Sequence, residues 1–211
     1  MKEVIKKIPL VKKIWNIIRV KIAENNFRKL IKSNKKICIV VGASGIFEPN
    51  WIPSDQEYFD ILKQEDWKYY FKSNSIDAIL SEHVWEHLTL HEGLIAAKNC
   101  FAYLKIGGYI RIAVPDGFHP EQSYIDSVKV GGSGAGADDH KVLYTFKSLV
   151  SLFEEAGFTV TLLEYFDNNG QFHTKEWDVM EGKIHRSAYF DKRNEDARLT
   201  YTSIILDARK I

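Results

Sequence analysis

Two histidines and two glutamates lie close together near the middle of the chain, directly after a short apolar segment. Residues Ile76–Leu88 read Ile-Asp-Ala-Ile-Leu-Ser-Glu-His-Val-Trp-Glu-His-Leu. The apolar part, 76–80, follows the turn-forming sequence Lys-Ser-Asn-Ser, which predicts a buried strand. In an open α/β sheet the ligand crevice lies at the carboxyl ends of the strands. The position of these four polar side chains therefore predicts a functional site.

The same residues also match a short zinc-binding pattern. His83, Glu86 and His87 have the spacing His-x-x-Glu-His, in which two histidines on one face of a helix bind Zn²⁺ and the glutamate acts as a base. That pattern needs a position within a helix and a third ligand, whereas here it directly follows a predicted strand. A zinc-dependent hydrolase built on His83 and His87 is therefore kept as an alternative function, and no resident metal is expected.

Glycines follow the first predicted core strand, the apolar segment 36–41. The turn reads Gly42-Ala43-Ser44-Gly45, and glycines at this place allow the backbone to approach a ligand closely. The turn lacks the third glycine of the dinucleotide-binding fingerprint and the lysine of a P-loop. It therefore predicts a ligand at the strand end without naming it.

Acidic residues follow in positions that suit a nucleoside. A second short strand is predicted before Asp55, whose carboxylate could accept hydrogen bonds from both hydroxyls of a ribose. Asp60 could do the same, and Asp55 could instead be an ordinary turn residue. Asp66 and Trp67 could bind an adenine amino group and cover the ring, or could belong to an aromatic helix packed on the core.

Further ionisable residues lie in two later loops. A helix over 91–105, ended by a Gly-Gly pair, and a strand over 109–114 are predicted, and Asp116 and His119 follow that strand. The segment 130–137 contains four glycines and is either a connector or a mobile lid that leads into Asp138-Asp139-His140-Lys141. The remaining elements are one helix and two closing strands: 145–156, 160–165 and 200–208.

The composition is that of a globular protein with one main domain. The 211 residues are 45% hydrophobic and 27% charged, enough for a substantial core. No apolar segment of about 18 residues predicts a transmembrane helix, and the N-terminus lacks the pattern of a signal peptide. Cys38 and Cys100 are expected to be reduced thiols, as in a cytoplasmic protein.

The charge is distributed unevenly. Residues 1–36 contain 12 Lys and Arg but only two Glu, whereas the rest of the chain has 17 basic and 26 acidic residues. Apolar residues and Trp15 recur among the lysines of this basic arm, which predicts one or two amphipathic helices. Such an arm could bind the inner face of an anionic membrane, a partner's groove or its own domain. The acidic body disfavours nucleic acid as a partner.

Element order and motifs together resemble the class I S-adenosylmethionine-dependent methyltransferases. The segments that carry the resemblance are Glu82–Leu88 (Glu-His-Val-Trp-Glu-His-Leu), Leu104–Arg111 and Val114–Gly117. They are most similar to a branch of small bacterial predicted methyltransferases, often associated with surface-polysaccharide synthesis. The resemblance covers about 37–208 and leaves the basic arm outside.

The resemblance implies an α/β fold with a seven-stranded, mostly parallel, Rossmann-like sheet whose last strand is antiparallel. A methyltransferase domain, 37–211, would follow the helical arm, 1–36. S-adenosylmethionine would lie over the carboxyl ends of the first, second and central strands and leave as S-adenosylhomocysteine. The resemblance implies that the methionyl part lies near Gly42, Ala43, Ser44 and Gly45 and that Asp55 binds the ribose. Asp66 and Trp67 would flank the adenine. The sulfonium would lie near Ser81, Glu82 and His83.

The expected reaction is methyl transfer to a small-molecule or saccharide acceptor, at a hydroxyl group. A hydroxyl must lose its proton, and a histidine with a pKa near neutrality is the usual base. The candidates are His83, His119 and His140, of which His140 is favoured because it follows the predicted lid. The aspartates that could orient an imidazole or bind a divalent ion are Asp116, Asp138 and Asp139. A protein that binds the cofactor without turnover is a second alternative.

Overall fold

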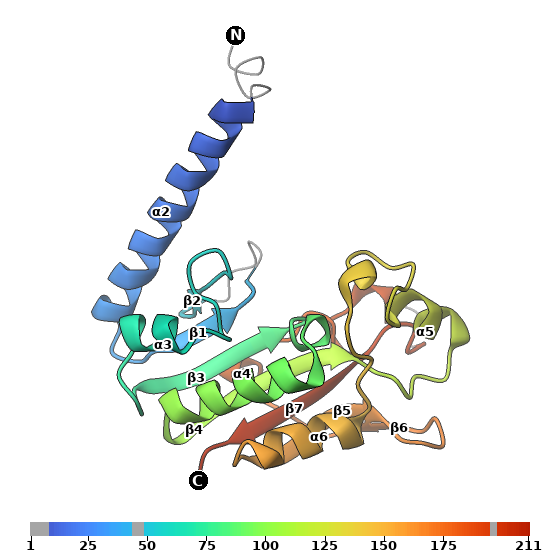
Figure 1. The fold of residues 1–211 in the computed structure, drawn as a ribbon. Coiled ribbons are helices and arrows are strands. Elements are labelled where there is room, and N and C mark those ends of the chain that lie inside the picture. Colours follow the sequence, from blue (N-terminus) through green and yellow to red (C-terminus); the bar gives the residue numbers. More distant parts are fainter. Residues whose placement is uncertain (1–8, 44–48, 195–197) are drawn as a thin grey trace.

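The computed structural model describes residues 9–43, 49–194 and 198–211 (Figure 1). Its centre is a seven-stranded sheet with the order β2-β1-β3-β4-β7-β5-β6. The strands are β1 (Cys38–Val41), β2 (Ile52–Pro53), β3 (Ile76–Glu82), β4 (Leu104–Pro115), β5 (Thr159–Phe166), β6 (Phe172–Thr174) and β7 (Ser203–Arg209). The helices and 3₁₀ turns are α2 (Pro9–Ser33), α3 (Gln64–Tyr70), η1 (Trp85–His87), α4 (Leu90–Tyr103), α5 (Gln122–Val128), η2 (Ala137–Asp139), α6 (Phe146–Glu155), η3 (Val179–Glu181) and η4 (Lys192–Asn194).

The strand directions confirm the predicted Rossmann-like sheet. β1 pairs in parallel with β2 and β3, and β3 pairs in parallel with β4. β7, the last strand, lies antiparallel between β4 and β5, and the short β6 is antiparallel to β5. The carboxyl ends of β1, β3 and β4 therefore meet at one edge of the sheet, where the polar residues that follow these strands come together.

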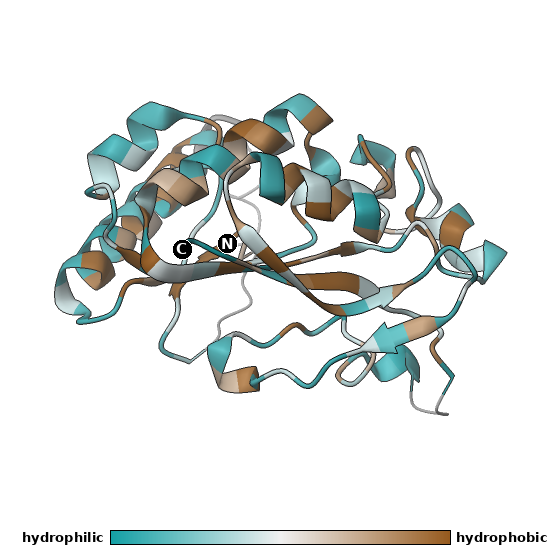
Figure 2. Cartoon of the chain, turned by 90° about the horizontal axis from the view of Figure 1, so that it is seen from below, coloured by the Kyte–Doolittle hydropathy of each residue, from teal (hydrophilic) through white to brown (hydrophobic). Residues whose placement is uncertain are grey.

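The two faces of the sheet are covered by different kinds of structure (Figure 2). Helices α3, α4 and α6 lie on one face, over an apolar cluster that includes Trp67, Trp85 and Phe153. The irregular segment 175–194 crosses the other face, where Ile184 packs with Leu80 of β3. That segment brings residues far along the chain to the edge where β1 and β3 end.

A buried ion pair fastens this irregular segment to the sheet. Arg111 of β4 is 1% exposed and donates two hydrogen bonds, of 2.8 and 2.9 Å, to the carboxylate of Asp207 on β7. It also donates to the carbonyl oxygens of Asp178 and Gly182, both at 2.8 Å. Its guanidinium group lies 4.9 Å from the ring centre of Trp177. The Arg111 side chain thus binds the covering segment to the sheet at several residues.

Side-chain caps set the start of α4, and the sequence prediction of its end was wrong. Thr89 and Glu92 form a capping box at the first turn. The helix ends at Tyr103, and β4 begins directly at Leu104, before the Gly-Gly pair that was expected to end the helix. Gly107, with a φ of 82°, lies instead within β4. This strand pairs with β3 from its first residue, and that pairing ends the helix early.

The predicted ends of α6 are confirmed. The Thr145 side chain accepts a hydrogen bond from the main-chain N–H of Ser148, which caps the first turn. The helix ends before Gly157, whose φ of 102° is a conformation that glycine adopts without strain. Local sequence signals were sufficient here because each cap lies within a few residues of the helix it ends.

The second half of α2 belongs to the domain core. Phe27 is 1% exposed, and its ring centre lies 5.5 and 5.6 Å from those of Tyr58 and Phe59. It also contacts Tyr70 and Phe71 edge to face. The basic arm is therefore joined to the domain through one aromatic cluster.

The first half of α2 projects away from the domain (Figure 1). Its large apolar side chains are between 46% and 61% exposed: Ile14, Trp15, Ile17, Ile18 and Ile22. Ile18 and Phe27 are nine positions apart, which at about 100° per residue places them on opposite sides of the helix. The exposed apolar face therefore points away from the face that packs on the domain. In the part of the chain that the structure describes, no helix has the length and apolarity needed to cross a membrane.

Candidate functional site

The polar residues of the central stretch lie at the carboxyl end of β3. This strand ends at Glu82, and His83 follows with a φ of 55°, a left-handed conformation that turns the chain into η1. Gly42 follows β1 with a φ of 65°, and a Cβ added to it would lie 2.6 Å from Cγ2 of Val84. Only glycine fits this position. The end of β1 therefore approaches the central stretch closely.

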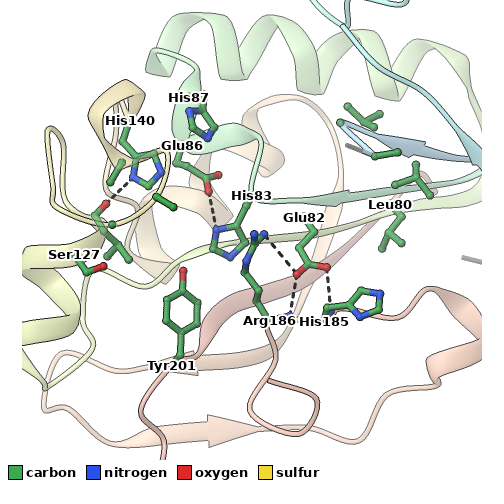
Figure 3. A pocket seen from close by; sticks show the side chains of 18 of the residues that line it. Leu80, Glu82, His83, Glu86, His87, Ser127, His140, His185, Arg186 and Tyr201 are labelled. Carbon is green, nitrogen blue, oxygen red and sulfur yellow. Dashed lines mark hydrogen bonds and ion pairs between the residues drawn. The ribbon is translucent and has the colours of Figure 1, made fainter. Parts of the chain in front are cut away.

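Two adjoining cavities lie at this edge of the sheet, and Figure 3 shows the larger. The larger cavity has a volume of about 450 Å³ and is lined by the ends of β1 and β3, by η1, by the loop after α5 and by residues within 183–201. The smaller cavity, of about 340 Å³, is lined mainly by residues within 55–62 and by η1. Gly42, His83 and His87 line both.

Several of the residues predicted to bind the cofactor lie on these walls. Those that line the larger cavity are Gly42, Ala43, Glu82 and His83. Asp55 lines the smaller cavity. Ser81 is fully buried and lines neither. Ser44 and Gly45 lie outside the described residues.

Asp66 and Trp67 hold a loop of the smaller cavity and do not line it. The Asp66 carboxylate accepts a hydrogen bond of 2.8 Å from the main-chain N–H of Asp60. The Trp67 indole N–H donates to the carbonyl oxygen of Ile61 at 2.9 Å. Because Trp67 is completely buried, its ring is part of the core, which is one of the two roles that the sequence left open.

Both ring nitrogens of His83 are engaged. Nε2 lies 3.0 Å from the Ser203 hydroxyl, which itself donates to the carbonyl oxygen of Arg186 at 2.8 Å. A hydroxyl has one proton to donate, so Nε2 of His83 is the donor in this contact. Nδ1 lies 2.9 Å from a carboxylate oxygen of Glu86, an ion-pair distance. His83 is therefore poorly placed to remove a proton from an acceptor.

The His-x-x-Glu-His pattern does not have the geometry of a zinc hydrolase. That geometry needs both histidines on one face of a helix, whereas His83 precedes a turn of three residues and has a left-handed backbone. Its two nitrogens already bind Ser203 and Glu86. The alternative of a zinc site built on His83 and His87 is therefore wrong, because a strand end replaces the helix that the pattern requires.

Glu86 is a buried carboxylate without a hydrogen-bond partner within 9–43, 49–194 and 198–211. Its side chain is 1% exposed, and the contact with His83 lacks hydrogen-bond alignment. Burial raises the pKa of Glu86, but the neighbouring His83 and, more weakly, His87 outweigh this effect and hold the pKa below its usual value. A negative charge is thus kept beside the larger cavity.

His140 lines the larger cavity, and its Nε2 is able to accept a proton. Its Nδ1 lies 2.7 Å from the carbonyl oxygen of Val128, and a carbonyl oxygen only accepts, so Nδ1 carries the proton and Nε2 a lone pair. The ring lies 4.8 Å from that of His87, edge to face. Of the three histidines predicted as bases, His140 is the one that lines the cavity with a nitrogen left to accept a proton.

His119 and Asp116 lie in a buried network that lines neither cavity. The two carboxylate oxygens of Asp116 accept hydrogen bonds from the main-chain N–H groups of Phe118 and Phe166, at 2.9 and 2.7 Å. Burial raises the pKa of Asp116 to about 6 and lowers that of His119. Nε2 of His119 bonds to the carbonyl oxygen of Leu199 at 3.0 Å. Both residues thus hold loops together at the sheet edge.

Asp139 lies at the edge of the smaller cavity. Its carboxylate is 2.6 Å from Nζ of Lys141, a hydrogen bond that lowers the pKa of Asp139, and 3.6 Å from Nδ1 of His87. Asp138 is exposed. Gly134 and Ala135 of the predicted lid line the larger cavity, which places that glycine-rich segment against the site.

Sequence reasoning missed one wall of the larger cavity. This wall consists of Lys183, His185, Arg186, Arg193 and Tyr201. Figure 3 labels three of them, His185, Arg186 and Tyr201. The Glu82 carboxylate positions it by accepting hydrogen bonds of 3.0 and 2.9 Å from the main-chain N–H groups of His185 and Arg186. More than one hundred residues separate these partners, so no local pattern could predict the contact.

No model of a protein family matches the sequence, and no curated protein matches it. Among solved structures, an S-adenosylmethionine-dependent methyltransferase from Thermotoga maritima has 13% identity and a TM-score of 0.51, covering 99% of each chain. The chain has a methyltransferase fold.

Two further solved structures are similar to the chain. A methyltransferase from Archaeoglobus fulgidus has 15% identity and a TM-score of 0.48, covering 90% of this chain and 94% of its own. A phosphoethanolamine N-methyltransferase from Haemonchus contortus, in complex with S-adenosyl-L-methionine, has 12% identity and a TM-score of 0.45, covering 88% of this chain and 52% of its own.

Proposed function

We propose that this chain is an S-adenosylmethionine-dependent methyltransferase. The observation that carries the proposal is the pair of adjoining cavities at the ends of β1 and β3, which share Gly42, His83 and His87. One cavity suits a nucleoside and the other an acceptor, and the close approach at Gly42 lies where they adjoin. This is the ligand-binding edge of an open α/β sheet.

The smaller cavity is proposed to hold the nucleoside part of the cofactor. Asp55 would accept hydrogen bonds from the two ribose hydroxyls. The adenine would lie against 60–62, the loop that Asp66 and Trp67 fix through its backbone. The methionyl part would pass Gly42 and Ala43, which line the larger cavity.

The larger cavity is proposed to hold a small-molecule or saccharide acceptor. Its volume of about 450 Å³ is in the range of small-ligand sites. When bound, the cofactor supplies a methyl group activated by its sulfonium. The walls of the cavity would align the acceptor oxygen with that methyl group, and Nε2 of His140 would take the hydroxyl proton. The motifs of the central stretch favour a bacterial role in surface-polysaccharide synthesis.

Calorimetric titration with S-adenosylhomocysteine and S-adenosylmethionine tests the proposal. Wild type should bind both, and Asp55→Ala should weaken binding by about 10- to 100-fold, because hydrogen bonds to a charged group contribute about 1.5–3 kcal/mol. Glu57→Ala is the matched control, since this nearby carboxylate pairs with Arg19 of α2 and lines neither proposed cavity. Absence of binding to folded wild type would refute the proposal, and equal loss in both variants would refute the role of Asp55.

We also propose that the first half of α2 binds an anionic membrane surface. Exposed Ile14, Trp15 and Ile18 lie among Lys12, Lys13 and further basic residues, the composition of an interfacial helix. Flotation of the full chain with vesicles that contain anionic lipid is the test. Ile14→Glu with Ile18→Glu should abolish flotation.

Ile106 provides the control for this experiment. It is 79% exposed and lies near the start of β4, far along the chain from the arm. Ile106→Glu makes the same substitution once at an exposed isoleucine outside the arm and should leave flotation unchanged. Equal flotation of all the variants, or none for wild type, would refute the membrane proposal.

A further inference from the structure

Three side chains that bind metals in many proteins converge on the larger cavity. Glu86 and His87 come from η1, and His140 directly follows η2 (Figure 3). One ligand atom from each lies within 4.8 Å of the others. The proposed methyl transfer uses only His140 of these three, so the cluster as a whole has no assigned role.

Each of the three offers an available donor atom. His140 presents the lone pair of Nε2, since its Nδ1 donates to Val128. Nδ1 of His87 is buried and has no hydrogen-bond partner in the part of the chain that the structure describes, with the Asp139 carboxylate 3.6 Å away. Such an outer carboxylate is a common neighbour of a metal-binding histidine.

Glu86 gives an independent indication that a cation binds at this cluster. Its side chain is 1% exposed, and neither carboxylate oxygen has a hydrogen-bond partner among the described residues. Burying a carboxylate costs free energy unless it is paired and hydrogen-bonded. His83 approaches one oxygen only, at 2.9 Å. The other oxygen is left for a further partner.

We propose that Glu86, His87 and His140 bind one divalent transition-metal cation, for which Zn²⁺ is the probe. Two imidazoles and one carboxylate make up a known catalytic zinc set, which leaves the fourth position open. Zinc bound at about 2.0–2.1 Å from each would hold the ligand atoms about 3.3 Å apart. Binding would therefore draw the ligand atoms together by up to about 1.5 Å. Nitrogen donors disfavour Mg²⁺, which prefers oxygen.

This ligand set differs from the His-x-x-Glu-His pattern in two ways: Glu86 is a ligand where the pattern makes it the base, and one histidine is different. The pattern uses His83 as a ligand, whereas here the contacts of His83 with Ser203 and Glu86 exclude it. His140, 53 positions beyond His87, takes its place. Only the packing of the loop after η2 against η1 brings these residues together.

The open position would face the acceptor, and this part of the inference rests on the proposed methyl transfer. A hydroxyl oxygen bound to the cation would lose its proton to solvent more readily, as metal-bound water does. The oxygen would then form its bond to the methyl carbon while the carbon–sulfur bond breaks, and the sulfur would keep the electron pair as a neutral thioether. With the cation bound, His140 would act as a ligand in place of a base.

Calorimetric titration of the chelator-treated full chain with ZnCl₂ alone is the test. Wild type should bind one Zn²⁺ per chain, and His140→Ala and Glu86→Gln should each bind at least about 100-fold more weakly, because each removes one of three ligands. His91→Ala removes an exposed histidine of α4 and should bind as wild type does. Thermal unfolding of each variant without zinc establishes that it is folded.

The outcomes separate this inference from the proposed function. The metal site is refuted if wild type binds no stoichiometric zinc, or if His140→Ala and Glu86→Gln bind zinc as wild type does. This conclusion holds whether or not the chain binds S-adenosylhomocysteine. If His83→Asn loses zinc while His140→Ala keeps it, the sequence pattern is the site and the present ligand set is wrong. Zinc binding without any binding of S-adenosylhomocysteine would leave the metal site and refute the methyltransferase.

Discussion

The contact between Gly42 and Val84 gives the sharpest test of how the site is built. In Gly42→Ala the new Cβ would lie 2.6 Å from Cγ2 of Val84, far inside van der Waals contact, and the residue would keep a φ of 65°. The left-handed backbone costs an alanine about 1–2 kcal/mol. Overpacking adds about 1–3 kcal/mol. We expect a loss of unfolding free energy of about 2–5 kcal/mol.

Three further variants separate the strain from the clash. Gly107→Ala has a φ of 82° but meets no atom within 4 Å, so it should lose only about 1–2 kcal/mol. Val84→Ala removes the methyl group that the new Cβ would strike. Gly42→Ala combined with Val84→Ala should therefore be less destabilised than the sum of the single changes by about 1–3 kcal/mol.

Urea unfolding of wild type, Gly42→Ala, Val84→Ala and the double variant measures this coupling. Titration with S-adenosylhomocysteine shows whether the site is affected. The single change at Gly42 should weaken ligand binding, whereas Gly107→Ala, at the opposite end of β4 from the cavities, should not. A cycle that is additive within about 0.5 kcal/mol would refute the reasoning. Gly42 would then be required for something other than the close approach to Val84.

Further predictions concern two buried acids. Asp116 has a pKa raised to about 6 by burial from an ordinary 3.8, so its contribution to stability is fully present below pH 3.8 and is lost as the pH rises through 6. Wild type should lose about 3 kcal/mol of unfolding free energy relative to Asp116→Asn between about pH 3 and pH 7. A difference that urea midpoints show to be independent of pH would contradict this. Asp207→Ala should cost about 3–5 kcal/mol, because it leaves the buried Arg111 without its carboxylate. Arg209→Ala, next to the same pair but exposed by 42%, should cost under about 1 kcal/mol, and equal losses in the two variants would refute the role assigned to burial.

Local signals in the sequence determined the elements that carry the site. The apolar strands, the Thr145 cap and the glycine after β1 were predicted because each depends on residues that are neighbours along the chain. The same reasoning placed the polar end of β3 at the ligand-binding edge, since parallel strands meet there. It failed at the end of α4, where pairing of β4 with β3 overrode the Gly-Gly signal.

Tertiary structure alone decided what each polar side chain does. His83, His119 and His140 are the same residue type but have different surroundings. His83 contacts a hydroxyl, His119 contacts a carbonyl oxygen, and His140 faces the larger cavity, so their roles differ. Glu82 could not be assigned from sequence because its partners, His185 and Arg186, are more than one hundred positions away. Hydrogen-bond direction and burial depend on which distant segments pack together, and no pattern within a short stretch of sequence records that packing.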